Sequence, residues 1–185
     1  MYILILGILI FFGMHLVPSM VKFRLKMIAS LGQRRYQGLY AIIALVGLVL
    51  IIYGKSKAGY QVIWDPPVWS KNIVFVVMLP SFFLLVAADM KSNVKRFTRH
   101  PMLWGVALWS GVHLFANGDL ASMILFGSFF AFSLFAMFSA NMRGAAKQEI
   151  KYPLTKDAVT IFAGLIAYVV FIKYLHPYLI GVPII

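Results

Sequence analysis

The chain has 185 residues, of which 62% are hydrophobic and 12% are charged, and its mean hydropathy is +0.90. This balance excludes an ordinary soluble domain and predicts an all-α, polytopic membrane protein. Its net charge of +12 comes from Lys and Arg confined to short segments between apolar runs, which indicates membrane topology and contact with anionic lipids, not nucleic-acid binding. Because the chain has no Cys, disulfides, thiolate ligands, iron–sulfur clusters and Cys nucleophiles are excluded.

The first part of the chain predicts two membrane spans and one external loop. Residues 1–20 are apolar before any basic residue appears, which indicates an uncleaved span whose N-terminus lies outside. The loop at 21–36 holds several bases and no acid, so it is predicted to be cytoplasmic. A second span follows at 36–53. The Pro- and Trp-rich loop at 54–70 is typical of an ordered external segment at the membrane interface, either an aromatic anchor or a lid.

The next two spans are joined to a fifth by a very short turn. The third span, at 72–88, contains Pro80, and the fourth begins at Pro101, a residue suited to the first turn of a helix, and continues to Ala116. The turn Asn117-Gly118-Asp119 predicts an antiparallel hairpin between the fourth and fifth spans. Its Asn and Asp are interpreted as turn and helix-capping residues.

The last two spans are placed at 120–140 and 159–174. The loops at 89–99 and 141–156 are basic, like the loop at 21–36, and all three fall on one side of the predicted bundle. Six spans of about 17 to 21 residues fit a hydrocarbon core of about 30 Å. Residues 1–185 are therefore expected to form a single domain, a bundle of six transmembrane helices with both termini outside.

Three histidines, His15, His100 and His113, lie within or near predicted spans. A neutral imidazole is the commonest ligand for transition metals and haem, and two from different helices can bind an iron from opposite faces. One buried His is more often explained by a hydrogen bond to a neighbouring helix, but two in a small bundle favour a function. Their predicted depths place the backbones of His15 and His113 about 12 Å apart along the membrane normal. His100 is nearer His15 in depth, so a pairing of these two remains open.

The surroundings of His113 predict a small pocket. Ser110 and Gly111 are expected to leave room beside the helix. Apolar walls are expected from three aromatic neighbours, Trp104, Trp109 and Phe115.

Arg99-His100-Pro101, with Arg96 one turn earlier, forms a basic group at the cytoplasmic end of the fourth span. Two explanations of this basic group stay open. One is positive charge that sets the membrane topology, next to a helix that starts at a proline. The other is a binding site for a carboxylate, a phosphate or a haem propionate. The sequence shows no Ser-His-Asp set, paired carboxylates, phosphate loop or zinc motif, so it gives no support for a hydrolase or a nucleotide-driven mechanism.

Four motifs are specific when taken together. They are His15-Leu16 with Pro18-Ser19, Gly59-Tyr60 with Trp64-Asp65-Pro66-Pro67, Thr98-Arg99-His100-Pro101-Met102-Leu103-Trp104-Gly105, and His113-Leu114 with Ala116-Asn117-Gly118-Asp119. With them the chain resembles the NnrU family of bacterial membrane proteins over nearly its whole length. The family takes its name from an association with nitrite and nitric oxide metabolism in denitrifiers. The resemblance implies a multi-pass protein of the bacterial inner membrane, with both termini on the periplasmic side.

The NnrU family is related to the plastid cis-zeta-carotene isomerase, a haem b membrane enzyme in which histidines ligate the iron. His15 and His113 look like the matching positions, so the resemblance implies that they bind the iron of haem b. The isomerase has a cysteine three residues before its second histidine, where this chain has Ser110. Because this chain lacks that cysteine, the resemblance gives less support for redox-dependent ligand exchange and for carotenoid isomerisation.

A second resemblance covers only Arg99 to Gly105. An Arg-His-Pro sequence followed after three residues by Gly resembles a motif of integral-membrane methyltransferases, which act on isoprenylcysteine or phospholipids and bind S-adenosylmethionine. Those enzymes usually add an arginine and a Glu-Glu pair near the last spans. This chain offers Arg143 and a single Glu149, so the match is partial.

The leading hypothesis is an inner-membrane protein that binds haem b through His15 and His113 and has a redox or isomerase-type role on a small or lipophilic substrate. Arg99 and His100 would anchor anionic groups. A methyltransferase using Arg99, His100 and Glu149, and a non-enzymatic factor assisting assembly of a respiratory complex, are the alternatives. The sequence leaves open the substrate, the reaction, the electron partner and the oligomeric state.

Overall fold

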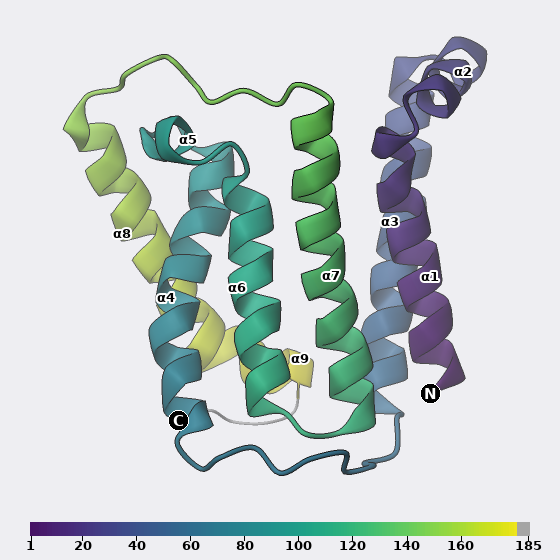
Figure 1. Cartoon of the computed structure of the whole chain (residues 1–185), viewed down its shortest axis with the longest axis vertical. Helices are drawn as coiled ribbons and strands as arrows, with labels where there is room; N and C mark the ends of the chain where they lie inside the picture. Colours follow the sequence, from purple (N-terminus) through teal and green to yellow (C-terminus); the bar gives the residue numbers. More distant parts are fainter. Residues whose placement is uncertain (181–185) are drawn as a thin grey trace.

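The protein is a bundle of long helices that run roughly along one direction (Figure 1). The computed structural model describes the backbone of residues 1–180 and the side chains of residues 1–178. Within this part no strand forms, and one isolated antiparallel bridge joins Val62 to Asp119. The elements in chain order are α1 (Tyr2–Leu16), η1 (Val17–Ser19), α2 (Val21–Leu31), α3 (Gln33–Ser56), α4 (Ser70–Asp89), α5 (Val94–Phe97), α6 (Pro101–Ala116), α7 (Leu120–Met142), α8 (Leu154–Val170), the π-helical turn η2 (Phe171–Leu175) and α9 (His176–Ile180).

The described helices are those of a multi-pass membrane protein. Five of them are long and apolar enough to cross a membrane, namely Tyr2–Ser19, Gln33–Ser56, Ser70–Asp89, Leu120–Met142 and Leu154–Tyr178. The predicted fourth span is α6, whose ends agree with the prediction. Its 16 residues span about 24 Å, less than the hydrocarbon core of about 30 Å. The count of six spans and the side of the termini therefore stay predictions, and the C-terminus lies outside the described residues.

The basic segment at 21–36 is not a loop as predicted, because residues 21–31 form the helix α2. The side chains of α2 are all at least partly exposed, and it ends at Gly32, whose φ of +80° suits glycine. A long apolar run predicts a membrane helix, and this short basic segment has none. The sixth span also begins earlier than predicted, at Leu154, directly after Pro153, which stands at the N-cap.

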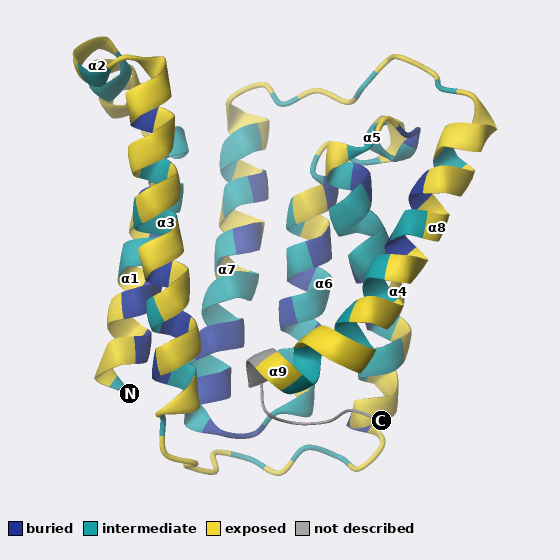
Figure 2. Ribbon diagram, turned by 180° about the vertical axis from the view of Figure 1, so that it is seen from behind, coloured by how far each residue is buried: buried dark blue, intermediate teal, exposed yellow. Residues whose placement is uncertain are grey.

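The helices form two units. In the first, α1 and α3 pack against each other along their length as an antiparallel hairpin. In the second, α4 packs between α6 and α8, and α6 packs against α7. Figures 1 and 2 both show the hairpin nearest to α7 and drawing away from it toward the end that carries α2 and α5.

Glycines bring α1 and α3 into backbone contact. A Cβ atom added at Gly47 would lie 2.7 Å from the Phe11 nitrogen, and one added at Gly54 would overlap the backbone of Leu4. Because lipid is as apolar as a Leu side chain, helices in a membrane associate through close packing more than through the hydrophobic effect. These small residues therefore hold the hairpin together.

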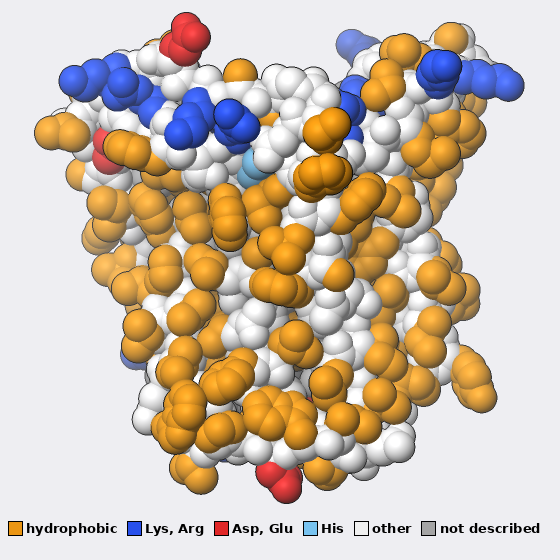
Figure 3. Space-filling model, viewed as in Figure 1, with side chains coloured by type: hydrophobic (Ala, Val, Ile, Leu, Met, Phe, Trp, Pro, Cys, Tyr) orange, Lys and Arg blue, Asp and Glu red, His pale blue; other side chains and the backbone are white. Residues whose placement is uncertain are grey.

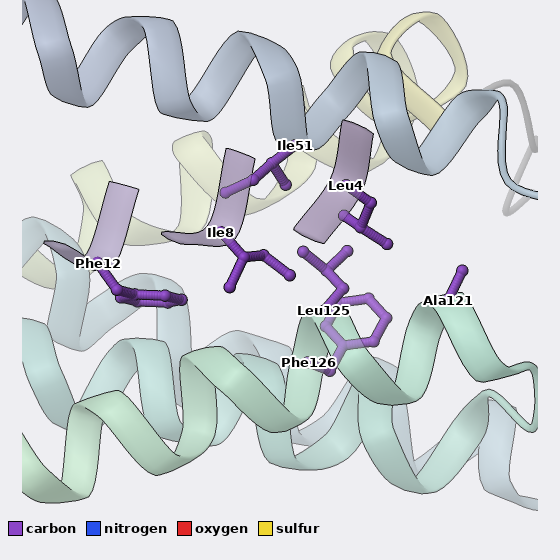
Figure 4. Close-up of a cluster of buried hydrophobic side chains, with 7 residues drawn as sticks. All are labelled: Leu4, Ile8, Phe12, Ile51, Ala121, Leu125 and Phe126. Atoms are coloured by element: carbon purple, nitrogen blue, oxygen red, sulfur yellow. The ribbon is translucent and has the colours of Figure 1, made fainter. Parts of the chain in front are cut away.

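A cluster of buried apolar side chains joins the hairpin to α7 (Figure 4). Leu4, Ile8 and Phe12 come from α1, and Leu125 and Phe126 from α7. Ile51 of α3 and Ala121 of α7 complete the cluster. It anchors the hairpin at the half of α7 that is farther from α2 and α5.

The surface divides into an apolar belt and a charged end. Large apolar side chains are exposed along the outer faces of the long helices, which Figure 2 shows as mostly exposed or intermediate. Figure 3 shows Lys and Arg gathered at the end that carries α2 and α5, which we call the basic end. Of the 17 Lys and Arg residues, all but Lys55, Lys57, Lys71 and Lys173 belong to the three segments of this end.

The opposite end is closed by the segment at 57–69, which is pinned to the turn between α6 and α7. The Gly118 carbonyl accepts hydrogen bonds from the amides of Ile63 and Trp64, and Leu120 donates to the carbonyl of Gln61. A Cβ atom at Gly118 would overlap the Trp64 carbonyl oxygen, so glycine is required there. The predicted external loop is thus ordered by backbone hydrogen bonds.

Candidate functional site

His15 lies near the end of α1 and presents one ring nitrogen to a ligand. Its Nδ1 is 2.7 Å from the Phe11 carbonyl oxygen. A carbonyl oxygen only accepts hydrogen bonds, so Nδ1 carries the proton and Nε2 keeps its lone pair. The His15 ring stacks on Phe11, with centroids 4.1 Å apart, and meets the edge of Phe132 of α7.

His113 has the same arrangement on α6. Its Nδ1 lies 2.8 Å from the carbonyl oxygen of Trp109, one turn earlier. Its ring is half-buried and contacts Phe126 of α7, with centroids 4.9 Å apart, and also Trp109. Within the described part of the chain, Nε2 of neither His15 nor His113 takes part in a hydrogen bond.

Aromatic rings on α7 connect the two histidines. Phe129 contacts Phe11 of α1 on one side and Trp109 of α6 on the other. His113 meets α7 at Phe126 and His15 meets it at Phe132, so the two levels are about 9 Å apart along the helix axis.

Measured in the same way along α7, His15 lies farther from His100 than from His113. His100 meets α7 at Asn141, about 13 Å along the axis from Phe132. Its Nε2 already bonds to the Asn141 side chain, 3.0 Å away. The geometry therefore favours His113 over His100 as the partner of His15.

Imidazole is a ligand that proteins offer to haem iron. Histidine ligands usually donate their second ring N–H to a carbonyl or carboxylate, which fixes the tautomer and the ring orientation. His15 and His113 both do so, through carbonyls of their own helices. No group of three or more His, Cys, Asp or Glu gathers among the described residues.

The predicted surroundings of His113 need correction. Trp109 does contact His113, but Phe115 packs instead on Trp64 and Trp69 of the segment at 57–69. Trp104 is 44% exposed on the outer face. Of the small residues, Ser110 is fully buried and donates to the Val106 carbonyl, and a Cβ at Gly111 would lie 3.3 Å from the Phe130 ring. The space predicted beside α6 is filled by neighbouring helices.

The basic end holds a separate cavity of about 410 Å³ at the start of α6. Arg99 and His100, both predicted as site residues, line it. Its other lining residues are Ala88, Lys95, Pro101, Met102, Leu103, Ala146, Lys147 and Gln148. No carboxylate belongs to this lining; Glu149 follows it in sequence and is exposed. His113 lies thirteen residues from His100 on the same helix, about 20 Å along the axis.

Two asparagines outside the lining connect the segments that surround this cavity. The Asn141 side-chain oxygen accepts a hydrogen bond from Arg99, 3.2 Å away, and lies 3.0 Å from His100 Nε2, which ties the start of α6 to the end of α7. Asn93 bonds through its side chain and backbone to Asp157 of α8 and to Tyr152. The segment between α7 and α8 is thereby held over α5.

Sequence reasoning missed these asparagines and the aromatic rings of α7 as parts of the two sites. Asn141 had one detectable signal, an amide at the end of an apolar span beside basic residues. Phe129 and Phe132 had none, because α7 is rich in Phe all around and only packing shows which rings face α1 and α6.

Comparison with known proteins was made on sequence and on structure. No curated protein and no solved structure matches the chain. The sequence model of one family, described as NnrU protein, matches residues 3–184, which is nearly the whole chain. The protein therefore belongs to the NnrU family.

Proposed function

We propose that this protein is an inner-membrane haem b protein whose iron is held by His15 and His113. The observation that supports the proposal is the matched state of the two imidazoles, each donating its Nδ1–H to a carbonyl of its own helix and each with Nε2 unbonded in the described part of the chain. They come from different units of the fold, and each contacts a Phe ring of α7, His15 at Phe132 and His113 at Phe126.

The chain's own residues have defined tasks in this proposal. The carbonyls of Phe11 and Trp109 hold the Nδ1 protons and so aim the Nε2 lone pairs. Phe129, between the two histidines, excludes water from the region and lowers its polarity. When bound, haem b supplies an iron that changes between the ferric and ferrous states. The proposed role is redox or isomerase-type, on a small or lipophilic substrate linked to nitrite or nitric oxide metabolism.

The proposed location is the bacterial inner membrane, with the basic end in the cytoplasm. The positive-inside rule supports this orientation, since the three basic segments all lie at one end of the bundle. The choice of haem b rests on the sequence resemblance of His15 and His113 to the histidines of the plastid isomerase. Ser110 is buried and bonded within its own helix, so it takes no part in ligation.

An absorption spectrum tests the proposal. Protein purified in mild detergent from haem-supplied cells is expected to show a Soret band, with sharp bands after reduction by dithionite. His15→Ala and His113→Ala should each lose these bands while eluting from gel filtration like the wild type, because the remaining imidazole alone binds the iron weakly.

Two control variants sharpen this test. Glu149→Ala should keep the spectrum, since Glu149 is exposed at the basic end. His100→Ala should keep it as well, because the His100 Nε2 is bonded to Asn141. Retained haem in the His113 variant would contradict the assignment, and loss in the His100 variant would replace His113 by His100.

The two alternative functions stay predictions. For a methyltransferase, no carboxylate among the described lining residues faces the sulfonium of S-adenosylmethionine, and the cavity is rich in positive charge. No observation on the described residues favours an assembly factor over a haem protein.

A further inference from the structure

We propose that the cavity at the basic end is a binding site for a phosphate group, carried by the head group of an anionic lipid. It goes beyond the proposed function, because the cavity and His113 lie at opposite ends of α6. Its volume of about 410 Å³ is within the range of small-molecule sites.

The charge of the lining selects an anion. Lys95, Arg99 and Lys147 bring three permanent positive charges to one cavity, and His100 adds an imidazole. Lys95, Arg99 and His100 come from the segment before α6 and Lys147 from the segment after α7, so the fold brings charges of two segments to one cavity. Arg and Lys recognise phosphate through charge-assisted hydrogen bonds, and Arg adds a paired-donor geometry.

The start of α6 adds backbone donors. The first amides of a helix have no partner within the helix, and α6 has no side-chain cap at His100. Met102 and Leu103 belong to this first turn and line the cavity. Free amides at a helix N-terminus, with the helix dipole behind them, favour a phosphate or another anion.

The Arg99 and His100 side chains are held in position before any ligand arrives. Both bond to Asn141 of α7, and Gln148 donates its amide to the Lys95 carbonyl, 3.0 Å away. Such pre-organisation reduces the entropy lost on binding. The Arg99 and His100 side chains are therefore fixed relative to the end of α7.

The apolar half of the lining favours a lipid as the source of the phosphate. Ala88, Pro101, Met102 and Leu103 line the cavity beside the cations, and Met102 is 47% exposed on the outer surface of the bundle. The basic end of the bundle is also where lipid head groups lie if the long helices cross the membrane. A phosphate at this height carries acyl chains that continue along the apolar belt.

Titration calorimetry of the detergent-solubilised protein tests the site with two probes. Short-chain phosphatidylglycerol is expected to bind, and short-chain phosphatidylcholine, which has no net charge, should bind at least tenfold more weakly. The double variant Arg99→Ala/Lys147→Ala should lose about tenfold or more in affinity for phosphatidylglycerol, since two charge-assisted contacts are removed. Lys147→Ala alone should lose part of it; Lys147 is exposed, so its removal leaves folding intact.

A matched variant removes the same charge elsewhere. Lys22→Ala/Arg24→Ala takes two cations from α2, at the same end but outside the cavity, and should bind phosphatidylglycerol like the wild type. An equal loss of affinity in both double variants would overturn the proposal, because general surface charge would then explain the binding.

Inorganic phosphate is expected to bind much more weakly than the lipid. Equal affinity would overturn the lipid as the source and assign the site to free phosphate. The lipid-binding measurement does not depend on the haem spectrum, so a negative result in one test leaves the other proposal untouched.

Discussion

At the scale of single residues, Asp119 performs two tasks at the opposite end of the bundle. It caps α7 by accepting a hydrogen bond from the Ser122 amide at 3.0 Å, and it forms an ion pair with Lys55 of α3 at 2.9 Å. Burial by itself raises the pKa of the Asp119 carboxyl, but hydrogen bonds from Ser122 and Lys55, together with the Lys55 charge, outweigh it and hold the pKa below its usual value.

This lowered pKa predicts a dependence of stability on pH. A carboxyl whose pKa is lower in the folded state stabilises the fold above its ordinary pKa, and the contribution is lost as pH falls through the folded value. Asp119→Asn should therefore be less stable than the wild type near neutral pH, and the difference should shrink in acid. The stability of both proteins can be measured by thermal unfolding in detergent from about pH 7 to about pH 3. A difference that stays constant over this range would contradict the assignment.

Residues also show what the sequence could and could not predict. Pro101 as the start of a helix and Asp119 as a cap were predicted and are confirmed, because caps and prolines act on their own backbone. The Lys55 partner of Asp119 was not predicted, since 64 residues separate the pair and only the packing of α3 on α7 brings them together. The contacts of Phe129 have the same origin.

At the scale of elements, the start of α8 depends on one side chain of another segment. Asn93 forms hydrogen bonds of 2.6–2.9 Å with Asp157 and Tyr152, and it is buried. Its partners include the Tyr152 backbone, which has no helix of its own to satisfy it. These contacts order the segment at 143–153, which has no regular structure beyond its first turn.

Asn93→Ala is expected to loosen this segment. Leaving buried polar groups without partners costs about 1–3 kcal/mol, and the chain nearby carries Lys147 and Lys151 as trypsin sites. Limited digestion followed by mass spectrometry should show faster cleavage there than in the wild type. Asn72→Ala, an exposed amide at the other end of the bundle, serves as the control and should be cleaved like the wild type. Equal rates in both variants would contradict the role of Asn93.

The bounds of the elements could be predicted where apolar runs or helix-breaking residues decide them. The helices α6 and α7 begin where predicted, after a turn that the sequence shows directly. The helices α2 and α5 were missed, because short basic segments carry no apolar periodicity and their structure depends on the surface against which they lie.

At the scale of the whole molecule, the orientation across the membrane can be measured because the chain has no Cys. Val68→Cys places a thiol on the external segment, where Val68 is 92% exposed, and Lys151→Cys places one at the basic end. If the basic end is cytoplasmic, a membrane-impermeant maleimide should label the first variant in intact spheroplasts and the second only after permeabilisation. The reverse pattern would invert the proposed orientation.

Composition predicted several apolar helices, which the structure confirms, but it did not predict how they are arranged. The hairpin of α6 and α7 follows from a three-residue turn and is confirmed. The separation into two units was not predicted, because it rests on glycine contacts between α1 and α3 and on how few residues connect this hairpin to α7.

These two units also imply an order of events during synthesis. The hairpin that carries His15 leaves the ribosome and enters the membrane before α6 and α7 are made. Until α7 is made, His15 lacks its contact with Phe132. The two proposed iron ligands therefore come together only late in biogenesis, when a finished hairpin docks on a later part of the chain.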